Sequence, residues 1–367
     1  MGFTHKFFDI ESCDPMQHLM RKPNMRVLDK WRDGEQYTKM WEWWQNGEIP
    51  SPSDTELQEL REKMEKVHGE EKTQEYFEKF AKKGVLKNPA WVQFMMDTAW
   101  ESKSYPDWQL MLPHAFNLQA AWSHDVHGNL IDKDDPFFWY TVFYPIFVTI
   151  RFRTEVAAEY MKAKSNVTIL GCGKLPELKQ VLSKFPDLLP NKIVACDKDA
   201  QVAQWAKTYA RTPLMVGRLD FRHQDMVEVL KSLPNGSQDV IRLGGILSYA
   251  THAIEKLMLL AWMKLKPGGV IVTDLQVLEW SLDCCIKMHG WQMPEPLQFL
   301  PSQTLEHAVA MMNEGVKHLP YSGLDYYVDP RLKDPIEATF VATKGRFRIK
   351  MLIPLFKMLS SQLFKKR

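Results

Sequence analysis

The sequence predicts an α/β protein in which a mainly helical region precedes a doubly wound sheet of mostly parallel strands. From Ser165 onward, short apolar runs rich in β-branched residues alternate with segments of helical periodicity, which is the pattern of parallel strands joined by helices. The first run, Asn166 to Leu170, leads directly into the sequence Gly-Cys-Gly. A glycine pair at the end of a buried strand allows the sharp turn at which such sheets bind ligands. We therefore expect the function to lie at this edge of the sheet.

Each expected strand is a short apolar run bounded by turn residues, and each expected helix has apolar residues at helical spacing. The third strand has two candidate positions, Leu214–Val216 and Leu219–His223. The other strands are expected at Val167–Leu170, Lys192–Cys196, Asp239–Leu243, Val270–Asp274 and Ile336–Thr343, and the helices at Pro176–Phe185, around Val202–Tyr209 and at Ala253–Lys264. The alternation continues almost to Lys344.

Residues 1–150 show no alternating strand pattern and are expected to be mainly helical. Ser53 and Glu56 form a capping-box pattern, after which apolar residues recur on one helix face as far as Val67. A second amphipathic helix is expected to follow and to end near Gly84. The region is dense in aromatic residues, which indicates either packed core or a lid over the strand ends.

We expect three regions along the chain. Residues 1–150 form the helical N-terminal or lid region, and residues 151–345 form the sheet domain. An insertion at about residues 291–329, with a helical pattern followed by tyrosines, is expected to cover the ligand. Residues 346–367 form a basic amphipathic tail, which we interpret either as a frayed or packed segment or as a helix that binds a membrane surface or a partner reversibly.

Composition gives no support to several classes of partner. The chain has 367 residues, 45% hydrophobic content and a formal net charge of +2, so it can bury a large core and has no excess of positive charge for nucleic acid. The apolar stretch 136–150 is too short to span a membrane and contains a proline. No nucleic-acid partner and no integral membrane segment are therefore expected, and the oligomeric state is left open.

Cysteine and histidine usage bears on compartment and metal binding. The five cysteines are an odd number and form no C-x-x-C pair, and the N-terminus lacks an apolar signal-peptide core. A reducing cytoplasm is the simplest setting. His124 and His127 form a His-x-x-His pair, but no third ligand follows at a recognisable spacing, so we expect no metal.

Polar residues follow several of the expected strands. Asp197 ends the second strand about twenty-five residues after the glycine pair, where a carboxylate accepts hydrogen bonds from ribose hydroxyls. Asp225 and Met226 follow the third strand, where they suit the amine and the face of an adenine. The sequence Leu-Lys-Pro-Gly-Gly, residues 265–269, leads into the fifth strand.

In this order, the motifs resemble those of the class I S-adenosylmethionine-dependent methyltransferases, whose domain is Rossmann-like. The resemblance covers Ser165 to about Lys344, half of the chain, and residues 265–269 are its most specific piece. It implies S-adenosyl-L-methionine as cofactor. It also implies cofactor contacts from the glycine turn, the two acids with the neighbouring methionine, and carbonyls after the fourth strand, namely Gly171, Cys172, Gly173, Asp197, Asp225, Met226, Leu243 and Gly244.

Two positions depart from the family pattern. The family usually carries an acid two residues before its first glycine, where this chain has Ile169, and a third glycine where this chain has Leu175. Either another residue replaces the missing acid, or the methionine end of the cofactor is held differently. The turn from Gly171 to Pro176 is similar to the Gly-x-Gly-x-Leu-Pro turn of nicotianamine synthases, which attack the aminocarboxypropyl carbon instead of the methyl group.

The leading functional hypothesis is methyl transfer to a small organic molecule. The acceptor is expected beyond the fourth and fifth strands, which nominates Tyr249, His252 and Asp274 to orient it or to remove its proton. Asp274 is also suited to binding a cationic acceptor. The alternatives are an azetidine-forming or nicotianamine synthase-like enzyme that releases methylthioadenosine, and a scaffold that binds the cofactor without catalysis.

Overall fold

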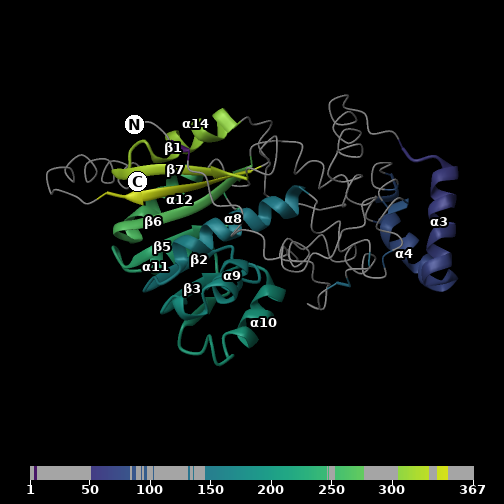
Figure 1. Cartoon of the computed structure of the whole chain (residues 1–367), viewed down its shortest axis with the longest axis horizontal. Helices are drawn as coiled ribbons and strands as arrows, with labels where there is room; N and C mark the ends of the chain where they lie inside the picture. Colours follow the sequence, from purple (N-terminus) through teal and green to yellow (C-terminus); the bar gives the residue numbers. More distant parts are fainter. Residues whose placement is uncertain are drawn as a thin grey trace, which may run out of the picture.

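The computed structural model describes residues 4–5, 51–82, 85–87, 92, 95–96, 102, 131–132, 135, 145–245, 247, 253–276, 305–329 and 337–345. Within these residues an eight-stranded sheet has the order β1-β7-β8-β6-β5-β2-β3-β4 (Figure 1). The strands are β1 (Thr4–His5), β2 (Asn166–Leu170), β3 (Lys192–Cys196), β4 (Leu219–Arg222), β5 (Gln238–Leu243), β6 (Leu265–Gln276), β7 (Tyr321–Val328) and β8 (Glu337–Lys344).

The strand order identifies the fold class. The chain runs outward from β2 through β3 to β4, then returns to place β5 and β6 on the other side of β2, and all these neighbours are parallel. This is the doubly wound order of the Rossmann fold, with its switch point between β2 and β5. Beyond β6 the sheet continues with β8, which is antiparallel to both β6 and β7. The predicted doubly wound α/β sheet is therefore confirmed.

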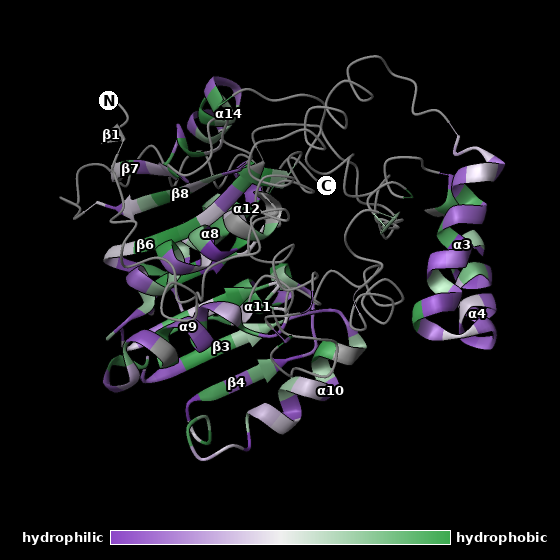
Figure 2. Ribbon diagram, turned by 45° about the vertical axis from the view of Figure 1, so that its right-hand side comes forward, coloured by the Kyte–Doolittle hydropathy of each residue, from purple (hydrophilic) through white to green (hydrophobic). Residues whose placement is uncertain are grey.

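Helices cover both faces of the sheet. One face packs against α8 (Pro145–Met161), α9 (Pro176–Lys184) and α10 (Ala200–Tyr209), and the other against α11 (Met226–Ser232), α12 (Ile254–Lys264) and α14 (Leu305–Val316). In Figure 2 the strands between these helices are largely hydrophobic, whereas the helices carry both kinds of residue. Central strands read as nearly continuous apolar runs because both of their faces are buried.

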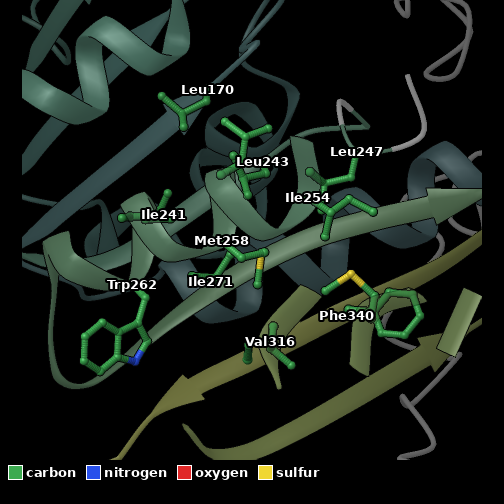
Figure 3. Close-up of a cluster of buried hydrophobic side chains, with 14 of the residues drawn as sticks. Leu170, Ile241, Leu243, Leu247, Ile254, Met258, Trp262, Ile271, Val316 and Phe340 are labelled. Carbon is green, nitrogen blue, oxygen red and sulfur yellow. The ribbon is translucent and has the colours of Figure 1, made fainter. Parts of the chain in front are cut away.

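Alternate residues of each strand enter different cores. Leu170 and Leu243 join the core under α11, α12 and α14, together with Met258 and Phe340 (Figure 3). Ile169, which precedes Leu170 in β2, belongs to the opposite core under α8, α9 and α10. This division decides which side chains lie beneath each part of the functional edge.

The Leu-Lys-Pro-Gly-Gly sequence forms a bulge inside β6 rather than a turn before it. Leu265 pairs with Gln238, but the next pair is Val270 with Val240, so four residues of β6 lie opposite one residue of β5. A side-chain carbon at Gly269 would lie 3.0 Å from the carbonyl oxygens of Gln238, Asp239 and Lys266. The motif thus requires glycine because the backbones approach so closely there.

Two strands refine the sequence prediction. Of the two candidate positions for the third strand, the structure has Leu219–Arg222, and residues 213–218 form turns. Residues 321–328, which we expected to belong to a covering insertion, are strand β7 of the sheet. The helical part of that insertion is confirmed as α14, Leu305–Val316. Residues 277–304 lie outside the described residues.

The N-terminal region contains a pair of helices that pack on each other, α3 (Asp54–His68) and α4 (Glu70–Lys82). The predicted capping box is confirmed, since Ser53 Oγ accepts from the Glu56 N–H at 3.2 Å and the Glu56 carboxylate accepts from the Ser53 N–H at 2.7 Å. Leu60 and Met64 are fully buried on the apolar face. Short 3-10 turns lie at Val85–Lys87 and Pro186–Leu188.

We expected a boundary at residue 150 between the N-terminal region and the sheet domain. Helix α8 includes residue 150 and packs directly on the sheet. Among the described residues, none of the helices has the length and apolar character needed to cross a membrane. The tail at 346–367, the aromatic stretch 136–144 and the His124–His127 pair lie outside the described part of the chain.

Candidate functional site

The glycine turn after β2 has the backbone that only glycine adopts freely. Gly171 and Gly173 have φ values of 60° and 47°, in the left-handed region that costs other residues about 1–2 kcal/mol. The Cys172 N–H donates to the Cys196 carbonyl at 3.0 Å, which fixes the turn to the end of β3. The turn therefore lies between the carboxyl ends of β2 and β3, as a ligand-binding loop of this fold does.

Asp197 is fixed by backbone hydrogen bonds. One carboxylate oxygen accepts from the Gly173 N–H at 2.9 Å and the other from the Asp199 N–H at 3.0 Å. The side chain is half-buried. A carboxylate held from both sides keeps one orientation and retains acceptor capacity on each oxygen, which suits it to a pair of neighbouring hydroxyls.

Asp225 has two roles at the end of β4. It is the N-cap of α11, accepting from the Val227 N–H at 2.8 Å, and it pairs with Lys198 at 2.6 Å. Partial burial acts to raise the pKa of Asp225, but the hydrogen bonds and the charge of Lys198 outweigh it and lower that pKa. Met226 begins α11 and packs its partly buried side chain on the core.

The end of β5 lies next to the glycine turn. The Gly244 N–H donates to the Leu170 carbonyl at 3.4 Å, and a side-chain carbon at Gly244 would lie 3.6 Å from the Gly171 carbonyl oxygen. The Leu243 carbonyl accepts from Thr273 Oγ1 at 3.2 Å. These contacts bring Leu243 and Gly244 to the switch point of the sheet, close to the turn from which they are separated by some seventy residues in the chain.

Three residues were nominated for catalysis. Tyr249 and His252 lie outside the described residues, so their roles remain predictions. Asp274 is fully buried in β6 and accepts hydrogen bonds from Arg242 and, at 2.9 Å, from Thr339 Oγ1. A third donor, the Gly245 N–H, lies 3.3 Å from Asp274 Oδ2, the oxygen that also accepts from Arg242.

Asp274 belongs to a buried network of charges, which we call the charged cluster. It comprises Arg153 from α8, Glu177 from α9, Arg242 from β5, Asp274 from β6 and Glu337 from β8. Arg242 occupies its centre, with 1% of its side chain exposed. It pairs with Glu177 at 3.0 Å and with Asp274. The cluster lies under the carboxyl ends of β5 and β6.

The protonation of the cluster follows from its charges. Burial acts to lower the pKa of Arg242 and of Arg153, but the neighbouring carboxylates outweigh it and raise both pKa values, so both guanidinium groups are charged. Burial raises the pKa of Glu337 to about 7, against the opposing charge of Arg153 and with the repulsion of Asp274. Glu337 therefore gains or loses a proton near neutral pH.

The two departures from the family pattern have structural explanations. Leu175 adopts φ 54°, the left-handed conformation that glycine takes easily, while its side chain is fully buried at the start of α9. Leu175 thus keeps the backbone of the missing glycine. Ile169 is buried and pairs in register with Arg242, so the position expected to carry an acid lies beside the centre of the charged cluster.

Both cysteines near the turn are free and buried. Burial raises the pKa of the Cys172 thiol well above its usual value and that of Cys196 to about 12. Both therefore remain neutral thiols, which are poor nucleophiles. Among the described residues, His, Cys, Asp and Glu side chains form no group of three or more that could hold a metal ion.

Sequence reasoning missed three charged residues of this edge. Arg153, Glu177 and Glu337 come from two helices and a late strand; the two glutamates are buried and Arg153 is largely buried, although these residue types usually stay at the surface. A sequence signal exists only in hindsight, since Glu337 directly follows Ile336, where the last strand was expected to begin. Nothing in the spacing relates position 153 to position 337.

Comparisons with known proteins bear on the fold. No protein-family model matches the sequence, and a search of curated proteins found no match. Among solved structures, one of a possible exported protein from Bordetella parapertussis is similar over 79% of this chain and 97% of that chain, with 16% identity and a TM-score of 0.50. A SAM-dependent methyltransferase from Archaeoglobus fulgidus is similar over 55% and 94%, with 15% identity and a TM-score of 0.38.

A SAM-dependent O-methyltransferase from Thermotoga maritima is similar over 56% of this chain and 67% of that chain, with 14% identity and a TM-score of 0.35. At these identities the similarity concerns the fold alone. The strand order itself is that of a Rossmann-like doubly wound sheet. The chain therefore has a Rossmann-like doubly wound fold, as the motifs predicted, whereas the likeness of its glycine turn to nicotianamine synthases stays a prediction.

Proposed function

We propose that this protein is an S-adenosylmethionine-dependent methyltransferase that acts on a small organic molecule. The observation that carries the proposal is the Asp197 carboxylate, which the Gly173 N–H holds at 2.9 Å beside the switch point of the sheet. In this fold, a fixed carboxylate at the end of the strand that corresponds to β3 binds the ribose of nucleotide-type ligands. Its direct link to the glycine turn couples ribose recognition to the backbone that approaches the ligand.

The residues at the edge fit an adenosyl ligand in a consistent order. Asp197 would bind the ribose, while Asp225 and Met226 would contact the adenine amine and face. The turn Gly171-Cys172-Gly173 would pass beneath the ribose and methionine parts, and the Leu243 and Gly244 carbonyls would face the methionine amino group. When bound, S-adenosylmethionine supplies a methyl group on a sulfonium, which leaves the protein to align the acceptor and exclude water.

Asp274 would act on the acceptor indirectly. Its carboxylate already accepts from Arg242, from Thr339 and from the Gly245 N–H, and its side chain is fully buried. We assign it the task of positioning the end of β5. Tyr249 and His252, which follow β5 in the chain, remain the proposed groups that orient the acceptor or take its proton.

A cytoplasmic location and a small-molecule partner complete the proposal. Cys172 and Cys196 are free thiols on adjacent segments, which a 3.0 Å backbone hydrogen bond joins. A reducing compartment keeps such neighbouring thiols from forming a disulfide. The net charge of +2 gives no support to a nucleic-acid partner. Peripheral membrane contact through the tail at 346–367 is kept as part of the proposal.

Product analysis tests the reaction. The protein is incubated with methyl-labelled S-adenosylmethionine and a panel of small acceptors, and products are identified by mass spectrometry. The proposal predicts S-adenosylhomocysteine together with a methylated acceptor. Methylthioadenosine as the enzymatic product would refute methyl transfer and indicate attack at the aminocarboxypropyl carbon. Binding of the cofactor with no turnover across the panel would favour a non-catalytic scaffold.

A further inference from the structure

An ion pair joins the helix before the sheet to the last strand of the sheet. Arg153 Nη1 of α8 donates to Glu337 Oε1 of β8 at 2.6 Å, across 184 positions of sequence. In register, Glu337 lies opposite Gln276 at the carboxyl end of β6. The pair therefore lies at the functional edge of the sheet, and not in its middle.

Gly245 places this pair beside the switch point. A side-chain carbon built on Gly245 would lie 3.4 Å from Arg153 Nη1 and 3.8 Å from Nη2, so the guanidinium lies within contact distance of this position. Gly245 directly follows Gly244, which packs on the Gly171 carbonyl oxygen. The Arg153 guanidinium thus lies one residue beyond the contact between β5 and the glycine turn.

Arg153 differs from Arg242 in its free hydrogen-bonding capacity. Arg242 has 1% of its side chain exposed and donates from all three nitrogens, to carboxylates and to carbonyl oxygens. Arg153 is 17% exposed, and its Nη1 donates to Glu337 while its Nε lies 4.0 Å from Asp274. Within the described residues its Nη2 donates no hydrogen bond, and Glu337 accepts none besides that from Arg153.

The charged cluster has one more negative charge than positive charges when all its groups are ionised. Glu177, Asp274 and Glu337 supply the carboxylates, and Arg153 and Arg242 the guanidinium groups. A buried excess charge is costly unless a proton or a ligand neutralises it. Burial raises the pKa of Glu337 to about 7, so in the free protein a proton partly serves that purpose. A cationic group bound beside Glu337 would replace the proton.

We propose that Arg153 and Glu337 bind the zwitterionic head of an α-amino acid, with the carboxylate on the free edge of Arg153 and the ammonium beside Glu337. A guanidinium fork matches a carboxylate, and a carboxylate matches an ammonium. Two sources share this chemistry, the methionine end of S-adenosylmethionine and a free amino-acid acceptor. The first source rests on the proposed function: Glu337 would then hold the methionine ammonium together with the carbonyls after β5, as the anchor that Ile169, at the position of the family acid, does not supply.

Paired ligands test the first source. S-adenosylhomocysteine carries the amino-acid head, and methylthioadenosine lacks it while keeping the adenosine part. By titration calorimetry the wild type should bind S-adenosylhomocysteine at least about tenfold more tightly, since charge-assisted hydrogen bonds to the head are lost in methylthioadenosine. Arg153→Met should abolish most of that preference and leave methylthioadenosine affinity within about threefold. Lys162→Met, which removes a charge just after the end of α8, is the matched control and should keep the preference.

Two conservative variants keep the test informative if Arg153→Met does not fold. Arg153→Lys retains the charge beside Glu337 but loses the planar fork, so the preference for S-adenosylhomocysteine should fall to an intermediate value. Glu337→Gln retains the shape of the side chain. It should weaken S-adenosylhomocysteine and remove the part of its pH dependence near pH 7 that titration of Glu337 causes. Arg153, Arg242 and Asp274 are the charged groups that act on Glu337 from α8, β5 and β6.

The outcomes separate this proposal from the proposed function. If the wild type binds S-adenosylhomocysteine and methylthioadenosine but Arg153→Met and Arg153→Lys keep the full preference, and if neither variant alters the binding of free methionine or glycine, the zwitterion site is overturned. If the wild type binds neither adenosyl compound, the proposed function fails. Free methionine and glycine then decide the zwitterion site alone, since binding that Arg153→Met abolishes supports it and no binding refutes it.

Discussion

The functional edge has two halves that are built in different ways. In the half at the ends of β2, β3 and β4, backbone N–H groups hold the acids: Gly173 and Asp199 donate to Asp197, and Val227 donates to Asp225. The half at the ends of β5, β6 and β8 is made by side chains that meet across the fold, such as Arg153 and Glu337. The first half contains motifs that are visible in the sequence, whereas the second half has no sequence motif.

The two halves should therefore differ in how they respond to substitution. Backbone N–H groups hold a carboxylate in place whatever the surrounding side chains are, so this kind of site tolerates divergence. Ion pairs between distant elements depend on every partner, because removal of one leaves a buried charge uncompensated. We therefore expect substitutions in the second half to disturb stability and amino-acid recognition, and those in the first half to disturb adenosine binding with little loss of stability.

The largest effect is expected at the centre of the charged cluster. Arg242→Met should reduce the free energy of unfolding by about 3–5 kcal/mol, since it leaves Asp274 and Glu177 buried without their guanidinium partner. Urea denaturation followed by tryptophan fluorescence measures it. Arg222→Met, at an ion pair with an exposed partner, Asp220, is the control and should cost at most about 1 kcal/mol. Equal losses in the two variants would remove the distinction between the halves.

The pH dependence of stability should report on Glu337. Its folded pKa of about 7 lies above the ordinary value, so the folded state binds more protons than the unfolded state between those two values. Stability should therefore fall as pH rises from about 4.5 to 7, by no more than about 3 kcal/mol from this group. Glu337→Gln should remove this part of the slope in denaturation curves measured across the range. An unchanged slope would show that Glu337 titrates normally.

Leu175 tests how the turn tolerates its departure from the family pattern. Leu175→Gly relieves a left-handed backbone worth about 1–2 kcal/mol but empties a fully buried leucine site worth about 2–5 kcal/mol. The net result should be a loss of about 1–3 kcal/mol in the free energy of unfolding, measured by thermal or urea denaturation. A more stable Leu175→Gly variant would mean that strain outweighs packing at this position.

Asp197 should affect both adenosyl ligands alike. Asp197→Asn weakens the ribose contacts and should reduce the affinity for S-adenosylhomocysteine and for methylthioadenosine by about 10- to 100-fold each, with stability changed by less than about 1 kcal/mol. Asp220→Asn, an exposed acid on the neighbouring strand, is the control. Calorimetry of both ligands measures it. A selective loss of S-adenosylhomocysteine would instead place the amino-acid head at Asp197.

The sequence predicted most of the half at the ends of β2, β3 and β4, but it did not predict the charged cluster in the other half. Strands β2, β3 and β5 were expected within one residue of their observed bounds, because buried parallel strands are continuous apolar runs. Strand β7 was missed since Tyr321–Val328 mixes serine, glycine and aspartate with its tyrosines and resembles a covering loop. The glycine turn and Asp197 were predicted from their spacing in the sequence. The ion pair of Arg153 with Glu337 has no characteristic spacing, because its residues come from distant parts of the chain.

The central claim is that the edge between β2 and β5 binds S-adenosylmethionine rather than another adenine nucleotide, since the Rossmann strand order and the acid after β3 are shared with nicotinamide-binding proteins. Titration calorimetry of S-adenosylhomocysteine and NAD into the wild-type protein, each alone and then in competition, tests it most directly. We predict one S-adenosylhomocysteine bound per chain, with no displacement by NAD. Preferential binding of NAD, with S-adenosylhomocysteine unable to compete, would contradict the account.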